Sequence, residues 1–313
     1  MGIEVLTRRR AKLTLEERDA FAEEMQAINW NDPVERNAIA LKIVKYVEDD
    51  KEKDDIVGLF ANIIQFNVGE TLEFTTVKGL KAYVHEPGTW APRSTVSQRY
   101  QTLATEQISA NVGFDLTALK GGRYGTMADF RSMAVEELLG RKYAMTWTTM
   151  IGSVPAANGI ALGYFAGAKT ATVLGKLMAL NSGLDYVEDQ KGGVAAIIGR
   201  RTAFNFLNDS TASASGGFSS VTRTNIENFG GLSAYRGHPI VKLNQYQDGY
   251  GVDRITDDEI MILAPNTLYI GENFGLEVYD KIEPENREWV VTMTEMYGAG
   301  LIFPERNARI ALS

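Results

Sequence analysis

The hydrophobic pattern at the start of the chain is helical. Thr14 and Glu17 have the spacing of a capping box, in which two side chains satisfy free N–H groups at a helix start. An amphipathic stretch follows, with apolar residues spaced so that they share one helix face. They are Phe21, Met25 and Ile28.

A second helix is predicted from Asp32 and Pro33, an N-cap residue followed by the residue type favoured in the first helical turn. Its apolar stripe consists of Ile39, Ile43, Val44 and Val47. The charged run at 48–55 lacks an apolar face, and a helix needs such a face to enter a core. Residues 1–55 are therefore predicted to form a helical arm that lies on another surface.

From Ile64 onward the pattern changes to the alternation of apolar and polar residues that is typical of strands. The outward half runs to the turn at Pro87 and Gly88, and the return half carries Tyr100, Leu103, Ile108, Val112 and Phe114. A two-stranded ribbon alone is marginally stable in water. The segment 66–110 is therefore predicted to be stabilised by another copy of the chain.

The second half of the chain combines two helices with a series of short strands. A long helix is predicted at 126–150, and a shorter one from Val173 that stops at Gly183. Short β-branched and aromatic runs, separated by Gly, Asp, Asn and Pro, then predict strands. These lie at 194–198, 240–243, 260–263, 276–282 and 289–293, with a surface loop at 208–217. The predicted class is α+β.

Composition narrows the class of protein. The 313 residues are 44% hydrophobic and 23% charged, which is typical of a globular chain. The sequence has no apolar stretch of the roughly 18 residues that a membrane helix needs, and its start lacks a signal-peptide core, so we expect a soluble, unexported protein without a membrane partner. The absence of cysteine from the sequence excludes disulfides, thiolate zinc sites and cysteine nucleophiles.

The charge balance argues against a protein whose main task is to grip nucleic acid. With 32 basic and 40 acidic residues, the net charge is -8, whereas phosphate neutralisation requires a basic surface. The cluster Arg8, Arg9, Arg10 and Lys12 is the exception. We interpret it as a solvated terminus, with an arm that touches DNA or acidic surfaces as the alternative.

Searches for catalytic and binding motifs give no candidate. His85 and His238 are far apart in the sequence and have no metal-ligand spacing around them. The stretch 163–170 lacks the contiguous Gly-Lys-Ser/Thr of a phosphate-binding loop. A carboxylate cluster lacks calcium-loop spacing and is interpreted as a turn before a helix or strand: Asp253, Asp257, Asp258 and Glu259. We predict no catalytic, cofactor-binding or metal-binding residue.

The order of these elements resembles the Hong Kong 97 type of major capsid protein of tailed bacteriophages, over nearly the whole chain. The resemblance rests on the stretches 82–88 and 100–109 before the long helix, on 235–241, which resembles the family's Gly-x-Pro-Val strand start, and on 287–312 as a closing strand. No single stretch is specific to the family; the resemblance lies in the order and spacing of the stretches together.

The resemblance implies a domain organisation. Residues 1–63 would be the N-terminal arm and 64–118 the extended β loop. Residues 119–193 and 265–313 would form the peripheral domain, with a spine helix at about 126–150, and 194–264 the axial domain. A scaffolding segment within the chain is not expected, because Met1 stands only some sixty residues before the loop. We expect a separate scaffolding protein instead.

The function implied is self-assembly, through hexamers and pentamers, into the icosahedral head that encloses double-stranded DNA. Implied partners are many copies of itself, a scaffolding protein, a portal, possible decoration proteins, and DNA by weak nonspecific contact; the location is the virion, after assembly in the host cytoplasm. We expect intersubunit contacts at Phe66, Phe74, Tyr83, Trp90 and Tyr100. Some family members crosslink a loop lysine; Lys78 and Lys81 lie in that segment without any mark of reactivity. The alternatives are an encapsulin-type compartment shell and an oligomeric enzyme with an unread site.

Overall fold

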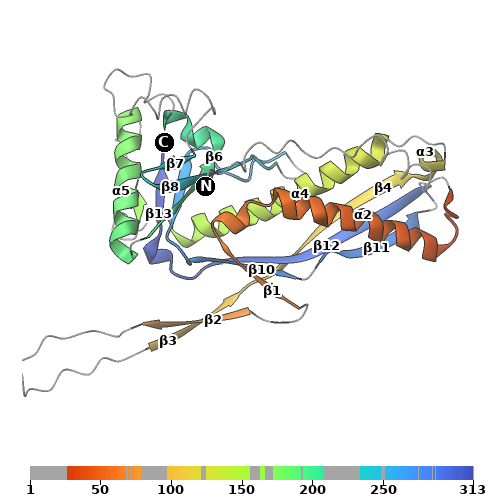
Figure 1. Ribbon diagram of the computed structural model, residues 1–313, viewed down its shortest axis with the longest axis horizontal. Coiled ribbons are helices and arrows are strands. Elements are labelled where there is room, and N and C mark those ends of the chain that lie inside the picture. The colour runs from red at the N-terminus through yellow and green to blue at the C-terminus, as the bar shows by residue number, and fades with distance from the viewer. Residues whose placement is uncertain are drawn as a thin grey trace, which may run out of the picture. The chain divides into compact units, whose positions relative to one another are not determined.

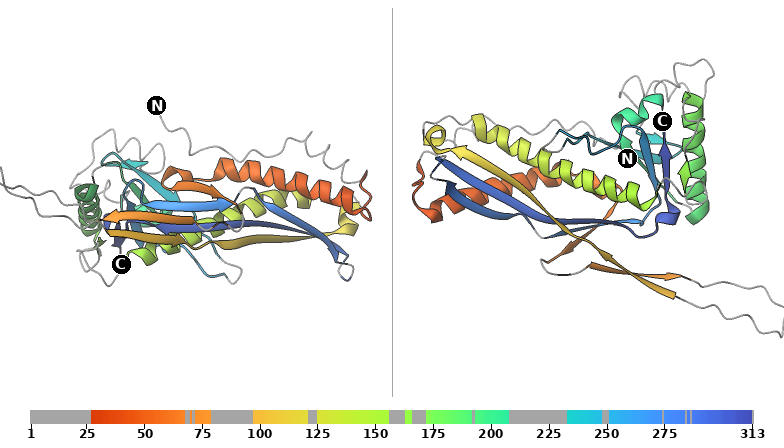
Figure 2. Two further views of the ribbon diagram at one scale, coloured as in Figure 1. Left: turned by 90° about the horizontal axis from the view of Figure 1, so that it is seen from below. Right: turned by 180° about the vertical axis from the view of Figure 1, so that it is seen from behind.

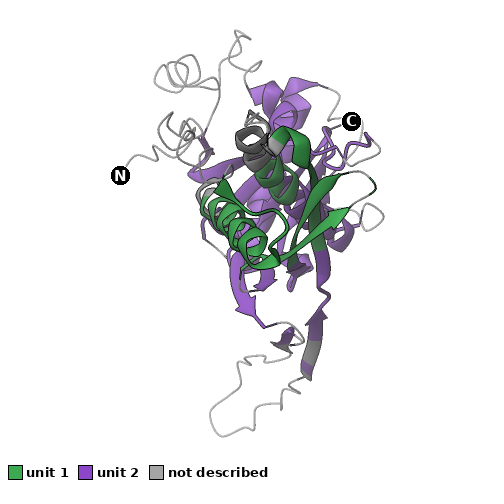
Figure 3. Cartoon of the chain, turned by 90° about the vertical axis from the view of Figure 1, so that its right-hand side faces the viewer, with its two compact units in different colours: residues 1–55, 108–139, 275–295 green, residues 56–107, 140–274, 296–313 purple. Residues whose placement is uncertain are grey.

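The computed structural model describes residues 27–67, 70, 72–78, 97–120, 125–155, 163–165, 172–191, 193–207, 233–247, 251–273, 275–283, 285 and 287–312. Within these ranges, the side chains of residues 50, 52–54, 75–78, 97, 99–100, 119–120, 125–132 and 191 lie outside the description. The chain divides into two compact units, each built from three stretches of sequence (Figure 3). Unit 1 comprises residues 1–55, 108–139 and 275–295; unit 2 comprises residues 56–107, 140–274 and 296–313.

Unit 1 contains a helix packed on a β-hairpin. Helix α2 (Pro33–Asp54) begins at Asp32, whose side chain accepts a hydrogen bond from the backbone N–H of Val34. Strand β11 (Glu277–Glu283) pairs antiparallel with the first half of β12 (Glu288–Leu301). The apolar stripe predicted for the second helix is buried: Ile39, Ile43, Val44 and Val47. The described part of the predicted arm is therefore packed within its own unit.

Aromatic rings complete the interior of unit 1. The indole of Trp289 contacts Trp30 edge-on, with ring centroids 5.2 Å apart, and Phe114 at 5.5 Å. Phe114 lies on β4 (Glu106–Asp115), which pairs with β12 and leads into α3 (Leu116–Lys120). Aromatic pairs in these geometries stabilise a core beyond the area they bury.

Helix α4 (Gly125–Ser153) covers the predicted spine helix of 126–150. Its residues up to Leu139 belong to unit 1, and those from Gly140 belong to unit 2. In unit 2, a built Cβ on Gly140 would collide with the ring of Tyr246. The glycine therefore allows that ring to lie directly against the helix backbone.

Besides its main sheet, unit 2 contains a smaller group of paired strands and a two-stranded ribbon (Figures 1 and 2). After the short helix η1 (Val57–Leu59), β1 (Asn62–Phe66) pairs parallel with β10 (Leu268–Asn273), which pairs antiparallel with the second half of β12. Strands β2 (Leu72–Lys78) and β3 (Ser97–Leu103) form a two-stranded antiparallel ribbon.

The main core of unit 2 lies between helix α5 (Val173–Lys191) and a six-stranded sheet. The strand order is β5-β13-β9-β6-β8-β7. In chain order these are β5 (Tyr164–Phe165), β6 (Ala196–Arg200), β7 (Ala234–Tyr235), β8 (His238–Leu243), β9 (Glu259–Leu263) and β13 (Ala308–Ala311). The short helices η5 (Arg201–Phe204) and η6 (Pro304–Arg306) follow β6 and β12 in the chain. Figure 1 shows α5 along this sheet, where Leu180, Leu184 and Val187 enter the core.

The prediction that the second helix stops at Gly183 is wrong, because α5 continues to Lys191. A Cβ on Gly183 would lie 2.9 Å from Cδ1 of Ile262 and 3.2 Å from Cδ1 of Ile310. The glycine therefore serves close packing of helix on sheet.

Two predicted segments are divided differently in the structure. Residues 106–115 were expected in the returning half of the loop, but as β4 they pair with β12, so the described ribbon consists of 72–78 and 97–103 only. Strand β13, expected in the peripheral domain, pairs with β9 of the expected axial domain.

The turn between β7 and β8 uses Arg236 and Gly237, both at positive φ. Such φ values are typical of a tight hairpin.

In the part of the chain that the structure describes, no helix combines the length and apolarity that crossing a bilayer requires. The predicted capping box at 14–17, the amphipathic stretch from Phe21 to Met25 and the predicted loop at 208–217 lie outside the described residues.

Candidate assembly surface

The root of the β2–β3 ribbon packs on glycines of unit 2. Leu72 and Leu103 face each other at the first pair of the ribbon. A Cβ on Gly271 of β10 would lie 2.5 Å from Cδ1 of Leu72, and one on Gly300 of β12 would collide with Cδ1 of Leu103. Only residues without a side chain leave this space, so we call Gly271 and Gly300 the glycine seat.

A third glycine extends this contact along β12. Gly298 pairs with Gly271 in register, and its built Cβ would lie 2.6 Å from the carbonyl oxygen of Ala104. The chain leaving the ribbon therefore passes directly over the backbone of β12 in unit 2.

The five residues expected at intersubunit contacts differ in burial and in whether the structure describes them. Phe66 is 1% exposed and buried within unit 2. Phe74 is half-buried, and its ring lies 4.8 Å from that of Tyr269. Tyr100 lies on β3, but its side chain is outside the description, and Tyr83 and Trp90 lie outside the described residues. Their contacts with a neighbouring subunit remain predictions.

The two candidate crosslink lysines also remain untested. Lys78 is the last residue of β2, and its side chain is not described. Lys81 lies outside the described residues.

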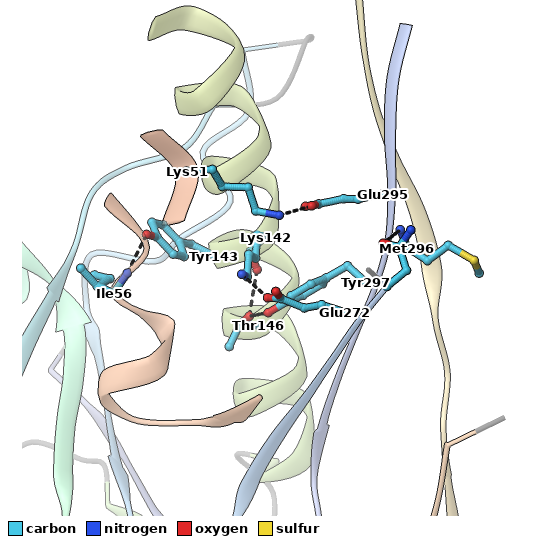
Figure 4. Close-up of polar contacts among 10 residues, drawn as sticks. Lys51, Ile56, Lys142, Tyr143, Thr146, Glu272, Glu295, Met296 and Tyr297 are labelled. Atoms are coloured by element: carbon cyan, nitrogen blue, oxygen red, sulfur yellow. Dashed lines mark hydrogen bonds and ion pairs between the residues drawn. The ribbon is translucent and has the colours of Figure 1, made fainter. Parts of the chain in front are cut away.

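A buried polar cluster joins α4 to the sheet inside unit 2 (Figure 4). Lys142 is fully buried and forms an ion pair with Glu272 of β10. Its ammonium also lies 5.4 Å from the ring centroid of Tyr297, on β12. Thr146 donates to the carbonyl of Lys142 at 2.8 Å, so its oxygen accepts the hydroxyl hydrogen of Tyr297 at 2.5 Å.

Lys142 belongs to no motif, yet the sequence carries a signal for its burial. It stands one turn after Leu138 and one turn before Thr146, on the face that carries the apolar stripe of the long helix. A lysine at such a position is rarely buried without an anionic partner. That rule alone predicts a carboxylate opposite the helix.

Hydrogen bonds and an ion pair hold both ends of α2 within unit 1. Near its start, Nε of Arg36 donates to Oδ2 of Asp280 at 3.3 Å, and the same oxygen accepts from the indole N–H of Trp289 at 3.1 Å. Near its end, Oε1 of Glu48 accepts from the backbone N–H of Leu276 at 2.5 Å. Lys51 forms an ion pair with the nearly buried Glu295 (Figure 4). The charged run after Val47 thus anchors the helix.

His238 has a structural role in unit 2. Its Nδ1 accepts from the backbone N–H of Ala195 at 2.9 Å, so Nε2 carries the proton of the neutral ring and donates to Glu188 at 2.7 Å. The ring therefore connects the first residue of β8 to the loop before β6 and to the end of α5. His85 lies outside the described residues.

Ion pairs and a turn use the carboxylates of the predicted cluster. Asp257 pairs with Arg200, and Glu259, the first residue of β9, pairs with Arg309. A hydrogen bond from Gln247 holds the pKa of Asp253 below its ordinary value. The cluster was interpreted as a turn before a helix or a strand, and the structure has the strand β9 there.

The described residues contain no group of three or more His, Asp or Glu side chains placed to hold a metal ion. Burial, followed by the nearby charge of Arg201, lowers the pKa of Lys242 on β8.

Comparisons with known proteins give likeness in structure and none in sequence. No protein-family profile matches the chain, and no curated protein matches it in sequence. A solved structure from Mycobacterium phage Ogopogo superimposes with a TM-score of 0.60 at 11% identity, covering 82% of this chain and 91% of the other. One from Microbacterium phage Oxtober96 gives 0.58 at 15%, covering 82% and 90%.

A third similar structure is the virus-like particle from Pyrococcus furiosus, with a TM-score of 0.55 at 14% identity and coverage of 86% and 97%. Identities this low show the fold alone. The chain therefore has the Hong Kong 97 type capsid fold, which confirms the α+β class and the fold predicted from the sequence.

Proposed function

We propose that this chain is a major capsid subunit, which assembles through hexamers and pentamers into an icosahedral head that encloses phage DNA. The observation that carries the proposal is the fold, shared over about four fifths of the chain with capsid structures of a cyanophage and of bacteriophage PhiM1. The buried polar side chains described above connect helices to strands, which is consistent with a structural protein.

The ribbon supports the same function. In the described part of the chain, β2 and β3 pair only with each other, and a two-stranded ribbon needs further contacts to be stable. Its root is fixed on the glycine seat, so its remaining length is available to a neighbouring subunit. The ribbon is therefore the element through which one copy would hold the next.

Negative-stain electron microscopy of the purified chain tests the proposal. We expect closed shells or their hexamers and pentamers when the chain is expressed with a scaffolding protein, and aberrant assemblies without one. A soluble monomer under both conditions would contradict the capsid function.

The same experiment separates the second candidate, a compartment shell of the same fold. That candidate predicts small, uniform closed shells from the chain alone, without a scaffold. It is kept because a virus-like particle is among the similar structures.

The charge of the subunit fits a shell that holds DNA without gripping it. A net charge of -8 favours weak, nonspecific contact with packaged DNA. A scaffolding protein, a portal and decoration proteins belong to the proposal as partners, and the virion, assembled in the host cytoplasm, as the location.

A further inference from the structure

Strand β1 is an edge strand without the usual protection. In the part of the chain that the structure describes, it pairs on one side only, with β10. Its five residues, Asn62–Phe66, include no charge and no proline. An exposed edge of this kind offers unpaired N–H and C=O groups to another chain, and natural proteins normally block such edges.

Two exposed apolar side chains lie beside this edge. Leu59, at the end of η1, is 60% exposed, and Ile63 on β1 is 42% exposed. A Cβ on Gly58, the residue before Leu59, would lie 3.7 Å from Cδ1 of Ile63, so the Ile63 side chain lies next to η1. An apolar side chain next to free backbone groups is what an added strand covers.

Strand β11 shows how this chain protects an edge strand. It also pairs on one side only, with β12. Four of its seven residues are charged: Glu277, Asp280, Lys281 and Glu283. By contrast, the β1 edge carries no charge that would oppose the addition of another strand.

The ribbon is the complementary surface. Strand β3 carries one charged residue in seven, so it can lie along β1 with few charges to desolvate. Leu72 and Leu103 hold its root on the glycine seat, and its described strands pair with each other and not with their own β1.

We propose that the free edge of β1, together with Leu59 and Ile63, is the docking surface for the β2–β3 ribbon of a second copy of this chain. The inference rests on the proposed capsid function and names the receiving surface. Because the ribbon and β1 are different surfaces, the contact is heterologous, and such contacts close into rings when the rotation allows. Each subunit would then donate one ribbon and receive one.

Disulfide trapping tests the pairing directly, because the sequence contains no cysteine. Ile63→Cys is combined in turn with Glu73→Cys, Gln98→Cys or Thr102→Cys, all at exposed positions, and assembled particles are oxidised. We expect a ladder of covalent multimers on a non-reducing gel from at least one pair, and no ladder from the ribbon cysteines alone.

Each other result has a definite meaning. Assembled particles without a ladder from any pair overturn the docking proposal and leave the capsid function intact. Dimers from Ile63→Cys alone, with no longer multimers in any pair, show that two β1 edges pair around a twofold axis, which also overturns it. A wild-type chain that forms no particle overturns the capsid function.

A charge placed on the edge gives a second, independent measurement. Ile63→Lys should lower particle yield at least about tenfold, because a buried ammonium opposes strand addition. Tyr279→Lys is the matched control on the protected edge β11, where Tyr279 is 60% exposed, and should change the yield less than about twofold. Equal far-UV circular dichroism of both variants excludes unfolding. Equal yields would contradict the proposal.

Discussion

At the scale of single residues, the glycine seat makes a prediction about stability. Gly271→Ala places a methyl group 2.5 Å from Cδ1 of Leu72, so the ribbon root must move. We expect the free energy of unfolding in urea to fall by about 1–3 kcal/mol, the usual cost of overpacking. Gly152→Ala is the control, since a Cβ there meets no atom within 4 Å on helix α4; it should stabilise by about 0.5–1 kcal/mol. Equal effects would contradict a packing role for Gly271.

The buried ion pair makes a second prediction at this scale. Lys142→Met leaves the carboxylate of Glu272 largely buried without its cation, which typically costs about 3–5 kcal/mol. The double variant Lys142→Met with Glu272→Leu removes both charges and should recover most of that loss. Urea unfolding of the wild type, both single variants and the double variant measures the coupling. A double variant as unstable as Lys142→Met alone would show that the pair is not the cause.

At the scale of elements, α2 should depend on Asp280. This carboxylate accepts from both Arg36 and Trp289, so Asp280→Ala leaves two donors without their acceptor. Loss of about 1–3 kcal/mol of local stability corresponds to amide exchange in residues 33–54 that is about five to a hundred and fifty times faster. Lys281→Ala is the control, because its pair with Glu283 is largely exposed. Unchanged exchange in Asp280→Ala would mean that the apolar stripe alone holds the helix.

The elements also show what the sequence could predict. Apolar spacing predicted α2, α4 and most strands, because each buries a face that its own period reveals. Gly183 was wrongly predicted to end a helix, because a glycine that ends a helix and one that lets a helix approach a sheet cannot be told apart in the sequence. The assignment of 106–115 to the ribbon failed for a related reason. Alternation shows that a strand exists, whereas its partner, here β12, is chosen by contacts distant in sequence.

The candidate surface was less predictable than the fold. Sequence alone suggested that the ribbon needs a neighbour, since two strands bury too little surface. It gave no sign that Phe66 turns inward, because an aromatic ring at a strand end suits a core and an interface equally. The glycine seat becomes visible only when β10 and β12 are paired in register.

At the scale of the whole molecule, a subunit of the proposed shell of hexamers and pentamers would occupy several slightly different positions. The segments predicted to need another surface, residues 1–55 and 66–110, are the ones expected to absorb this difference. Of their described parts, α2 packs within unit 1 whereas the ribbon strands pair only with each other, so we expect the ribbon to vary most. The six-stranded sheet with α5 buries a continuous apolar core, and packed cores resist deformation. A two-stranded ribbon attached at its root has no such core. Cryo-electron microscopy of assembled particles should therefore show quasi-equivalent copies that superimpose in the six-stranded sheet and diverge along β2 and β3. Copies that differ mainly within the sheet would contradict this division of roles.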